Sequence, residues 1–371
     1  MSRLYIYAAI IVLIIAAASI SVYSWFFLVP PIRKGHLRIG YQPSTHQIAY
    51  MTAMKKGWWL EDLKTFGVTT VSDYEFPSGP PEMTAMMVGE LDIAYVGATP
   101  PITAIDKGLD AKIVAGVQIQ GSALALRPPF NNTYTDPNDL IGLTVATFSP
   151  GSIQDTVLKK WLMDNDITVN PVVPSTGVTF SPMGSGDAIL AIKAKAVDGV
   201  FLPHPGPAIV ELEDAGSIVV DSGEMWLNHT CCCLLVSGTL IREYPEMVKE
   251  IIRIHIKATE YNIAHVDEAA EIFAEKVGWE VDDVKYSLNT WDGIWVHNPH
   301  VGLSITLDYA QVHYDLGYTD NLLTEVDLFD TSFYDEVIHE TQQMNFSPTE
   351  SITQGLKILI MDVSEKWLKK D

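Results

Sequence analysis

Residues able to bind an anion stand where predicted strands end and predicted helices begin. There a short apolar run gives way to serine, glycine, glutamine or tyrosine, and then to a helical pattern. The N–H groups at a helix N-terminus are unpaired, and the helix dipole adds about half a positive charge there. This pattern predicts a site for a small anion. The candidates are Tyr41, Gln42, Ser78, Gly79, Gly97, Ala98 and Thr99, followed by Gly151, Ser152, Gln154 and His204.

His204 differs from the other candidates because imidazole can donate a hydrogen bond to an anion or, when protonated, pair with it. It stands at the end of the predicted strand 197–202 and lies between two prolines. The alternative is a histidine that is structural or simply exposed. His297 and His300 offer a second imidazole pair, but no acidic residue stands beside them at ligand spacing. We therefore predict no metal site there.

The three cysteines are consecutive, at residues 231–233. Neighbouring side chains on a strand point to opposite faces, so ordinary disulfide geometry cannot join them without strain. A metal site would need further ligands from elsewhere in the chain. We interpret residues 231–236 as a buried strand in which cysteine acts as a small apolar side chain.

The elements that would hold the candidate residues alternate between strands and helices. In the first part we expect strands at 37–42, 68–76, 91–96 and 111–117, and helices at 48–56, 80–87 and 100–106. This alternation predicts a parallel sheet covered on both faces.

A second, similar series follows residue 120. It has strands at 140–148, 197–202 and 217–220, with helices at 149–161, 187–194 and 205–212. We interpret it as a second α/β lobe inserted in the first. Beyond residue 234 the pattern becomes mostly helical, at 244–265, 267–277 and 281–288.

Length and charge limit the class of protein. With 371 residues the chain exceeds what one core usually supports, which favours two lobes. The hydrophobic content of 47% excludes a disordered chain. The formal charge of -22 argues against nucleic acid as a partner, since phosphate binding needs clustered Lys and Arg.

The N-terminus is apolar and free of charge from residue 4 to 29, long enough to span a bilayer. Arg3 precedes this run and aromatic residues follow at 23–27. We expect an uncleaved membrane anchor with the rest of the chain outside the cytoplasm. The alternative is a signal peptide cleaved after the small residues 16–18, which would release the chain to the cell surface. Glycosylation acceptors at Asn131, Asn228 and Asn345 fit an exported chain.

Six segments, in order, resemble the solute-binding proteins of ABC importers for nitrate, sulfonate, taurine and bicarbonate. They are LRIGYQ, FPSGPPEMTAMMVGELDIAYVGATPPITAIDKG, IVAGVQ, DLIGLTVATFSPGS, AVDGVFLPHPGPAIVE and YPEMVKEIIRIHIKATEYN. The resemblance implies an α/β, two-lobed periplasmic-binding-protein fold of type II, preceded here by the N-terminal transmembrane helix. In that fold two strands cross between the lobes, here near 118–126 and 228–236, and the lobes close on the ligand.

The resemblance also implies domain limits and partners. A signal or anchor segment and linker would occupy 1–34, the first part of lobe I 35–121, lobe II 122–231, and the return to lobe I with C-terminal helices 232–371. The chain would bind a small anion, with aliphatic sulfonate favoured over nitrate or bicarbonate, and deliver it to a permease and ATPase. Relatives often carry an acidic residue near the position of His204, and its absence argues against taurine. No cofactor, metal or enzymatic activity is expected.

Two other classes stay open. Thiamine-pyrimidine synthases share this fold and carry a Cys-Cys-Cys-Phe-Cys run, which TCCCLLV resembles in its first half. They also use a lysine and a histidine after the third strand, and GATPPITAIDKG lacks both at the matching positions. A binding protein for the pyrimidine precursor is therefore a closer alternative than an enzyme. The remaining class is a membrane-anchored sensor or surface module.

Overall fold

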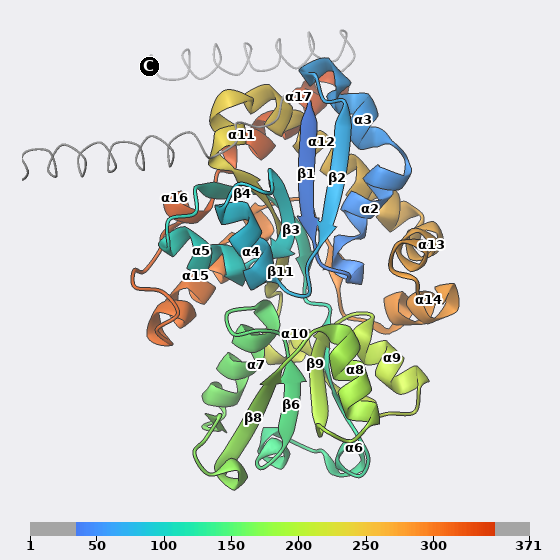
Figure 1. Cartoon of the computed structure of the whole chain (residues 1–371), viewed down its shortest axis with the longest axis vertical. Coiled ribbons are helices and arrows are strands. Elements are labelled where there is room, and N and C mark those ends of the chain that lie inside the picture. The colour runs from blue at the N-terminus through green and yellow to red at the C-terminus, as the bar shows by residue number, and fades with distance from the viewer. Residues whose placement is uncertain (1–34, 346–371) are drawn as a thin grey trace, which may run out of the picture.

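Two six-stranded sheets, one above the other in Figure 1, make up the molecule. The computed structural model describes residues 35–345. The predicted anchor at 1–34 lies outside the described residues. Within residues 35–345, no helix combines the length and the apolar character needed to cross a membrane.

The first sheet has the strand order β12-β4-β11-β3-β1-β2. Its strands are β1 (His36–Tyr41), β2 (Thr70–Glu75), β3 (Ile93–Gly97), β4 (Ala111–Ile119), β11 (Thr230–Ser237) and β12 (Ile294–Trp295). β1 runs parallel to β2 and β3, but β11 runs antiparallel to both β3 and β4. The four strands on which the prediction of a parallel sheet is based therefore run in one direction, but the sheet is mixed, because the returning strand β11 enters between β3 and β4 from the opposite end.

The second sheet has the order β10-β5-β9-β6-β8-β7. It comprises β5 (Ser122–Leu126), β6 (Thr144–Thr147), β7 (Thr168–Val169), β8 (Gly177–Pro182), β9 (Gly199–Pro203) and β10 (Ser217–Asp221). β5 is again antiparallel to both of its neighbours, while β6 is parallel to β8 and β9. The sequence pattern missed β7 and β8, since β7 is two residues long and a proline-containing loop separates the pair.

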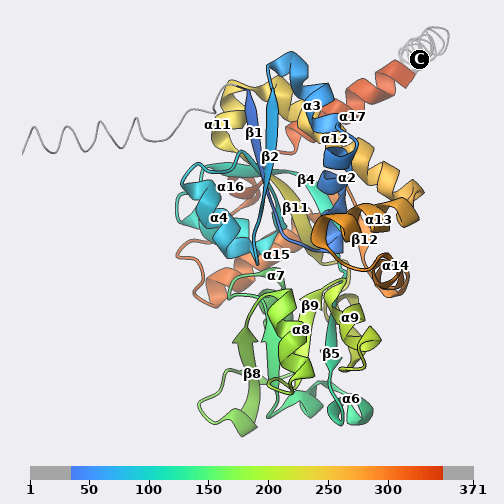
Figure 2. The ribbon, with the colours of Figure 1, turned by 45° about the vertical axis from the view of Figure 1, so that its right-hand side comes forward.

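Helices cover both sheets (Figures 1 and 2). Those that begin at the facing ends of the sheets include α4 (Gly79–Met87), α5 (Thr99–Asp106), α7 (Ile153–Asp164), α8 (Ser185–Lys193) and α9 (Gly206–Leu212). The remaining helices are α2 (Ile48–Lys55), α3 (Trp58–Leu63), α6 (Phe130–Thr133), α10 (Ser222–Met225), α11 (Gly238–Glu243), α12 (Pro245–Ala264), α13 (Val266–Val277), α14 (Val281–Thr290), α15 (His300–Asp315), α16 (Glu325–Leu328) and α17 (Ser332–Asn345). The sequence pattern did not predict α3, α6, α10, α11, α15, α16 or α17.

The chain passes between the sheets at Gln120 and Gly121 and returns before β11. Gln120 and Gly121 have φ of 56° and 88°, and Asn228 on the return has φ of 57°. This left-handed conformation suits glycine and is tolerated by few other residues. The backbone N–H of Gln120 donates to the carbonyl of His229 at 2.9 Å, and the Asp292 carboxylate accepts from the N–H of Gly121 at 2.8 Å. The two passages are thus joined to each other and to the first half of the fold.

Candidate functional site

A small pocket lies between the two sheets, where helices of both halves begin. The first half contributes Gln42, Ser44, His46, Gly79, Gly97, Pro100, Cys231 and Cys232, and the second half contributes Phe148, Ser152, Ile153, Gln154 and Pro203. The space open to the centres of water molecules is about 10 Å³, which is room for roughly one water. The two halves are therefore closed on each other.

Five of the predicted residues line this pocket: Gln42, Gly79, Gly97, Ser152 and Gln154. Their arrangement follows from the fold, because β1 and β3 end at this edge and α4 and α7 start at it. The Ser152 hydroxyl accepts from the backbone N–H of Asp155 at 3.2 Å and so caps α7. The Gln154 amide donates to the Ser122 hydroxyl at 3.0 Å.

The Gln42 amide donates to the carboxyl group of Glu82, which is fully buried at the start of α4. Burial raises the pKa of Glu82 well above its usual value. Burial therefore favours the protonated form of Glu82, which would place no negative charge beside the pocket.

The other predicted residues do not line the pocket. The Tyr41 hydroxyl donates to Glu75 at 3.0 Å, while Ala98 and Thr99 are buried at the start of α5. The Ser78 hydroxyl lies 3.1 Å from that of Ser149, which joins the two halves. Gly151 lines a neighbouring groove of about 400 Å³. A ligand role for these residues stays a prediction.

His204 is fully buried and does not line the pocket, although the preceding Pro203 does. Its Nδ1 lies 2.8 Å from the Ser287 hydroxyl, and its carbonyl accepts from the N–H of Thr45 at 3.0 Å. Burial, with a smaller contribution from the nearby His46, lowers the pKa of His204 to about 3. Near neutral pH the ring is uncharged, so pairing of a protonated His204 with an anion is disfavoured.

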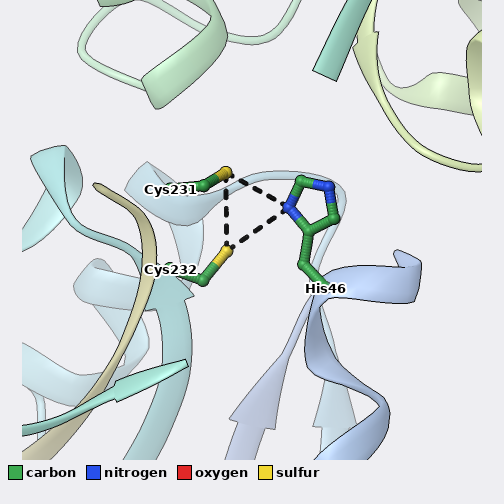
Figure 3. Close-up of side chains that lie close together, drawn as sticks. All are labelled: His46, Cys231 and Cys232. Atoms are coloured by element: carbon green, nitrogen blue, oxygen red, sulfur yellow. Dashed lines mark hydrogen bonds between the residues drawn. The ribbon is translucent and has the colours of Figure 1, made fainter. Parts of the chain in front are cut away.

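Sequence reasoning missed a cluster of His46, Cys231 and Cys232 in the pocket wall (Figure 3). The Nδ1 atom of His46 lies 3.1 Å from Sγ of Cys231 and 3.7 Å from Sγ of Cys232, and the two sulfur atoms are 3.8 Å apart. Both cysteines are free thiols. The signal that selected Gln42 applies equally to His46, because both residues closely follow β1.

The expectation that neighbouring cysteines point apart is wrong for this pair. The pairing of β11 with β4 shifts register between Thr230 and Cys232 and again between Cys232 and Cys233. Such an irregularity breaks the alternation of side chains and lets two consecutive residues approach one partner. The prediction of a buried strand is confirmed, since all three cysteines are at most 3% exposed.

Burial also governs ionisation of the thiols. It raises the pKa of Cys231 well above its usual value.

His313 of α15 forms another link between the halves. Its Nδ1 lies 3.1 Å from the hydroxyl of Thr103 on α5, and its Nε2 lies 2.9 Å from the hydroxyl of Thr156 on α7. Burial, followed by the charge of Lys159, lowers the pKa of His313 to about 4. The closed arrangement therefore uses a neutral imidazole.

His297 and His300 do not share a site. Nδ1 of His297 lies 2.8 Å from the Tyr334 hydroxyl, and Nε2 of His300 lies 2.8 Å from the Asp335 carboxylate. In the part of the chain that the structure describes, the cluster with metal-ligand geometry is instead His46, Cys231 and Cys232.

Several solved structures share this fold. The alkanesulfonate-binding protein SsuA from Xanthomonas axonopodis pv. citri, bound to MOPS, matches with a TM-score of 0.67 and 18% identity, over 80% of this chain and 98% of that one. The periplasmic nitrate-binding protein NrtA from Synechocystis PCC 6803 matches with a TM-score of 0.70 and 14% identity, over 86% and 91%. The fold is that of periplasmic solute-binding proteins, as the sequence resemblance predicted.

The chain belongs to the NMT1-like family, whose model matches residues 31–277. Among curated proteins, it is 26% identical over 239 residues to the "Putative aliphatic sulfonates-binding protein" of Bacillus subtilis (strain 168). That match covers 64% of this chain and 69% of the relative.

Proposed function

We propose that this protein is the substrate-binding component of an ABC importer and that it captures a small anion between its two sheets. Aliphatic sulfonate is the first candidate, and nitrate or bicarbonate is the second. The fold and the names of the relatives support this assignment, since they include sulfonate-binding and nitrate-binding proteins.

The observation that carries the proposal is a pocket that has polar groups from both halves and no Asp, Glu, Lys or Arg in its lining. Gln42 and Ser44 face Ser152 and Gln154 across the pocket, and α7 begins at the pocket wall. Amide, hydroxyl and backbone N–H groups can donate to the oxygens of an anion, and the helix dipole favours negative charge. Burial of Glu82 favours its uncharged form, which would add no repulsion.

The pocket has room for about one water, so a sulfonate requires the halves to separate before it enters. The passages at Gln120 and Asn228 are the places where the chain can bend. We assign the lobe limits at about residues 121 and 231 accordingly, and capture then follows a hinged closure.

The remaining parts of the assignment concern location and partners. We assign the protein to the outside of the cytoplasmic membrane, with residues 1–34 as its tether, and a permease and an ATPase as its partners. Its task is binding and delivery, without chemical conversion of the solute.

A thermal-shift screen of the full chain tests the function. Ethanesulfonate, nitrate, bicarbonate and an aminopyrimidine would be compared in matched chloride buffer. A ligand that binds only the folded state raises Tm by mass action. At a ligand concentration of 100 times Kd, the free energy of unfolding rises by about 2.7 kcal/mol. Saturable stabilisation by one anion supports the proposal. Stabilisation by the aminopyrimidine alone would assign a thiamine-precursor receptor instead, and no shift with any compound would contradict the anion proposal.

A further inference from the structure

We propose that His46, Cys231 and Cys232 form a binding site for a borderline-soft divalent cation, with Zn²⁺ as the reference ion. This site goes beyond the proposed anion binding and does not depend on it. The three side chains come from two distant parts of the chain, η1 (Thr45–Gln47) and β11, and meet in the wall of the pocket (Figure 3).

The distances among the donor atoms agree with tetrahedral coordination. Zn–S bonds of about 2.3 Å and Zn–N bonds of about 2.0–2.1 Å, at tetrahedral angles, place two sulfurs ~3.8 Å apart and sulfur and nitrogen ~3.6 Å apart. The observed separations are 3.8 Å between the sulfurs, and 3.1 and 3.7 Å from Nδ1 of His46 to the sulfurs. An ion can be accommodated with a shift of about 0.5 Å at one sulfur.

The histidine is oriented for this role by its second nitrogen. Nε2 of His46 lies 2.7 Å from the carbonyl oxygen of Gly121. A carbonyl can only accept, so the proton resides on Nε2 and the lone pair of Nδ1 faces the two thiols. A backbone carbonyl bonded to the far nitrogen is the usual outer partner of a metal-binding histidine. The amide of Gln47, 3.9 Å from Sγ of Cys232, lies close enough to support that thiolate.

The pocket supplies the fourth position. His46, Cys231 and Cys232 all line it, and its room for about one water would accommodate the ligand that completes four-coordination. Charge is also balanced, because two thiolates neutralise the two charges of the cation and the site stays neutral where it is buried. Binding releases the two thiol protons to solvent, and no oxidation or reduction is involved.

The alternative is an apolar cluster in which the thiols simply fill space. Cys233 shows that arrangement: it is the next residue on β11, is equally buried, and takes no part in the triangle of donor atoms. It therefore provides the matched control for any cysteine substitution.

The test uses the full chain, stripped of metal and kept reduced, and titrated with Co²⁺ as a spectroscopic probe. We expect one Co²⁺ per chain, a sulfur-to-cobalt charge-transfer band in the near ultraviolet, intense visible bands of tetrahedral cobalt, and displacement by Zn²⁺. C231S, C232S and H46Q should each weaken binding by more than about 100-fold, because loss of an outer partner alone typically costs 10–100-fold. C233S should leave the affinity unchanged.

Absence of the charge-transfer band in the wild-type chain would overturn the proposal. So would binding that persists in C231S and C232S, or equal weakening by C233S. If a variant fails to fold, X-ray absorption of the wild-type zinc complex decides, with two sulfurs at about 2.3 Å and one nitrogen at about 2.0 Å expected. Anion binding is measured on the same metal-free sample, so failure of the metal site and failure of the proposed function give different results.

Discussion

The backbone N–H of Thr45 and its side-chain hydroxyl both donate to the carbonyl oxygen of His204, each at 3.0 Å. Thr45 follows β1 in the first half, and His204 follows β9 in the second. Direct hydrogen bonds therefore join the two halves in the closed arrangement.

Gly97 is predicted to set how closely the halves approach. A Cβ atom at this position would lie 3.0 Å from Cγ1 of Ile153 on α7, across the pocket. Overpacking of this kind costs about 1–3 kcal/mol, and in G97A it acts on the closed state alone. We expect G97A to have a larger radius of gyration by small-angle X-ray scattering and at least about tenfold weaker anion binding.

G186A is the matched control for G97A, because a Cβ at Gly186 on α8 meets no atom within 4 Å. It should scatter and bind as the wild-type chain does. Equal scattering curves for G97A and G186A would contradict this role of Gly97.

Ser152 is predicted both to cap α7 and to contact the ligand. Ser237 is the control, because it caps a helix but does not line the pocket. Each serine caps a helix: the Ser152 hydroxyl accepts from Asp155 at 3.2 Å, and that of Ser237 accepts from Leu240 at 3.3 Å. Removal of either cap should cost about 1 kcal/mol in the free energy of unfolding, measured in urea. Only S152A should also weaken anion binding, since Ser237 does not line the pocket. Equal anion affinity in S152A and S237A would show that Ser152 does not contact the ligand.

Acid is predicted to destabilise the protein through its buried histidines. Burial lowers the pKa of His204 and His229 to about 3, and that of His255 and His313 to about 4. Their unfolded pKa is about 6.5, so the stabilising contribution is present above pH 6.5 and is lost as pH falls toward 4. As pH falls from 7 to 5, each of these histidines should lower the free energy of unfolding by about 2 kcal/mol. Urea unfolding at pH 7, 6 and 5 measures this slope, and an unchanged free energy of unfolding would contradict it.

Glu82 is predicted to act in the opposite direction. Burial raises the folded pKa of Glu82. Its contribution to the free energy of unfolding is therefore complete below the unfolded pKa of about 4.3, and it is lost as pH rises through the folded pKa. E82Q keeps the shape but needs no proton, and it should be more stable than the wild-type chain at pH 8. E82A should be less stable, because it leaves a cavity and removes the partner of the Gln42 amide. Thermal unfolding of both variants at pH 8 tests the sign, and a lower Tm for E82Q would contradict it.

The sequence predicted the alternation of elements well and their pairing less well. β1, β3 and the starts of α4 and α7 follow from hydrophobic periodicity and turn residues, and these elements place Gln42, Gly79, Gly97, Ser152 and Gln154 at the pocket. These signals are local in the chain, so they can be recognised without knowledge of the tertiary structure.

Features that depend on distant contacts could not be predicted in this way. The entry of β11 between β3 and β4, and its shift of register at Cys232, depend on residues more than a hundred positions away. That shift brings Cys231 and Cys232 to the same histidine. The burial of His204 depends likewise on Thr45 and Ser287, which the local pattern around it does not reveal.

Isothermal titration calorimetry of the full chain with ethanesulfonate tests the central claim most directly. The account predicts saturable binding at one site per chain, weakened at least about tenfold in G97A and S152A and unchanged in G186A and S237A. Nitrate and bicarbonate, titrated in the same way, establish whether the sulfonate is preferred. Absence of saturable heat with all three anions, or equal affinity in all four variants, would contradict anion capture in the pocket between the sheets.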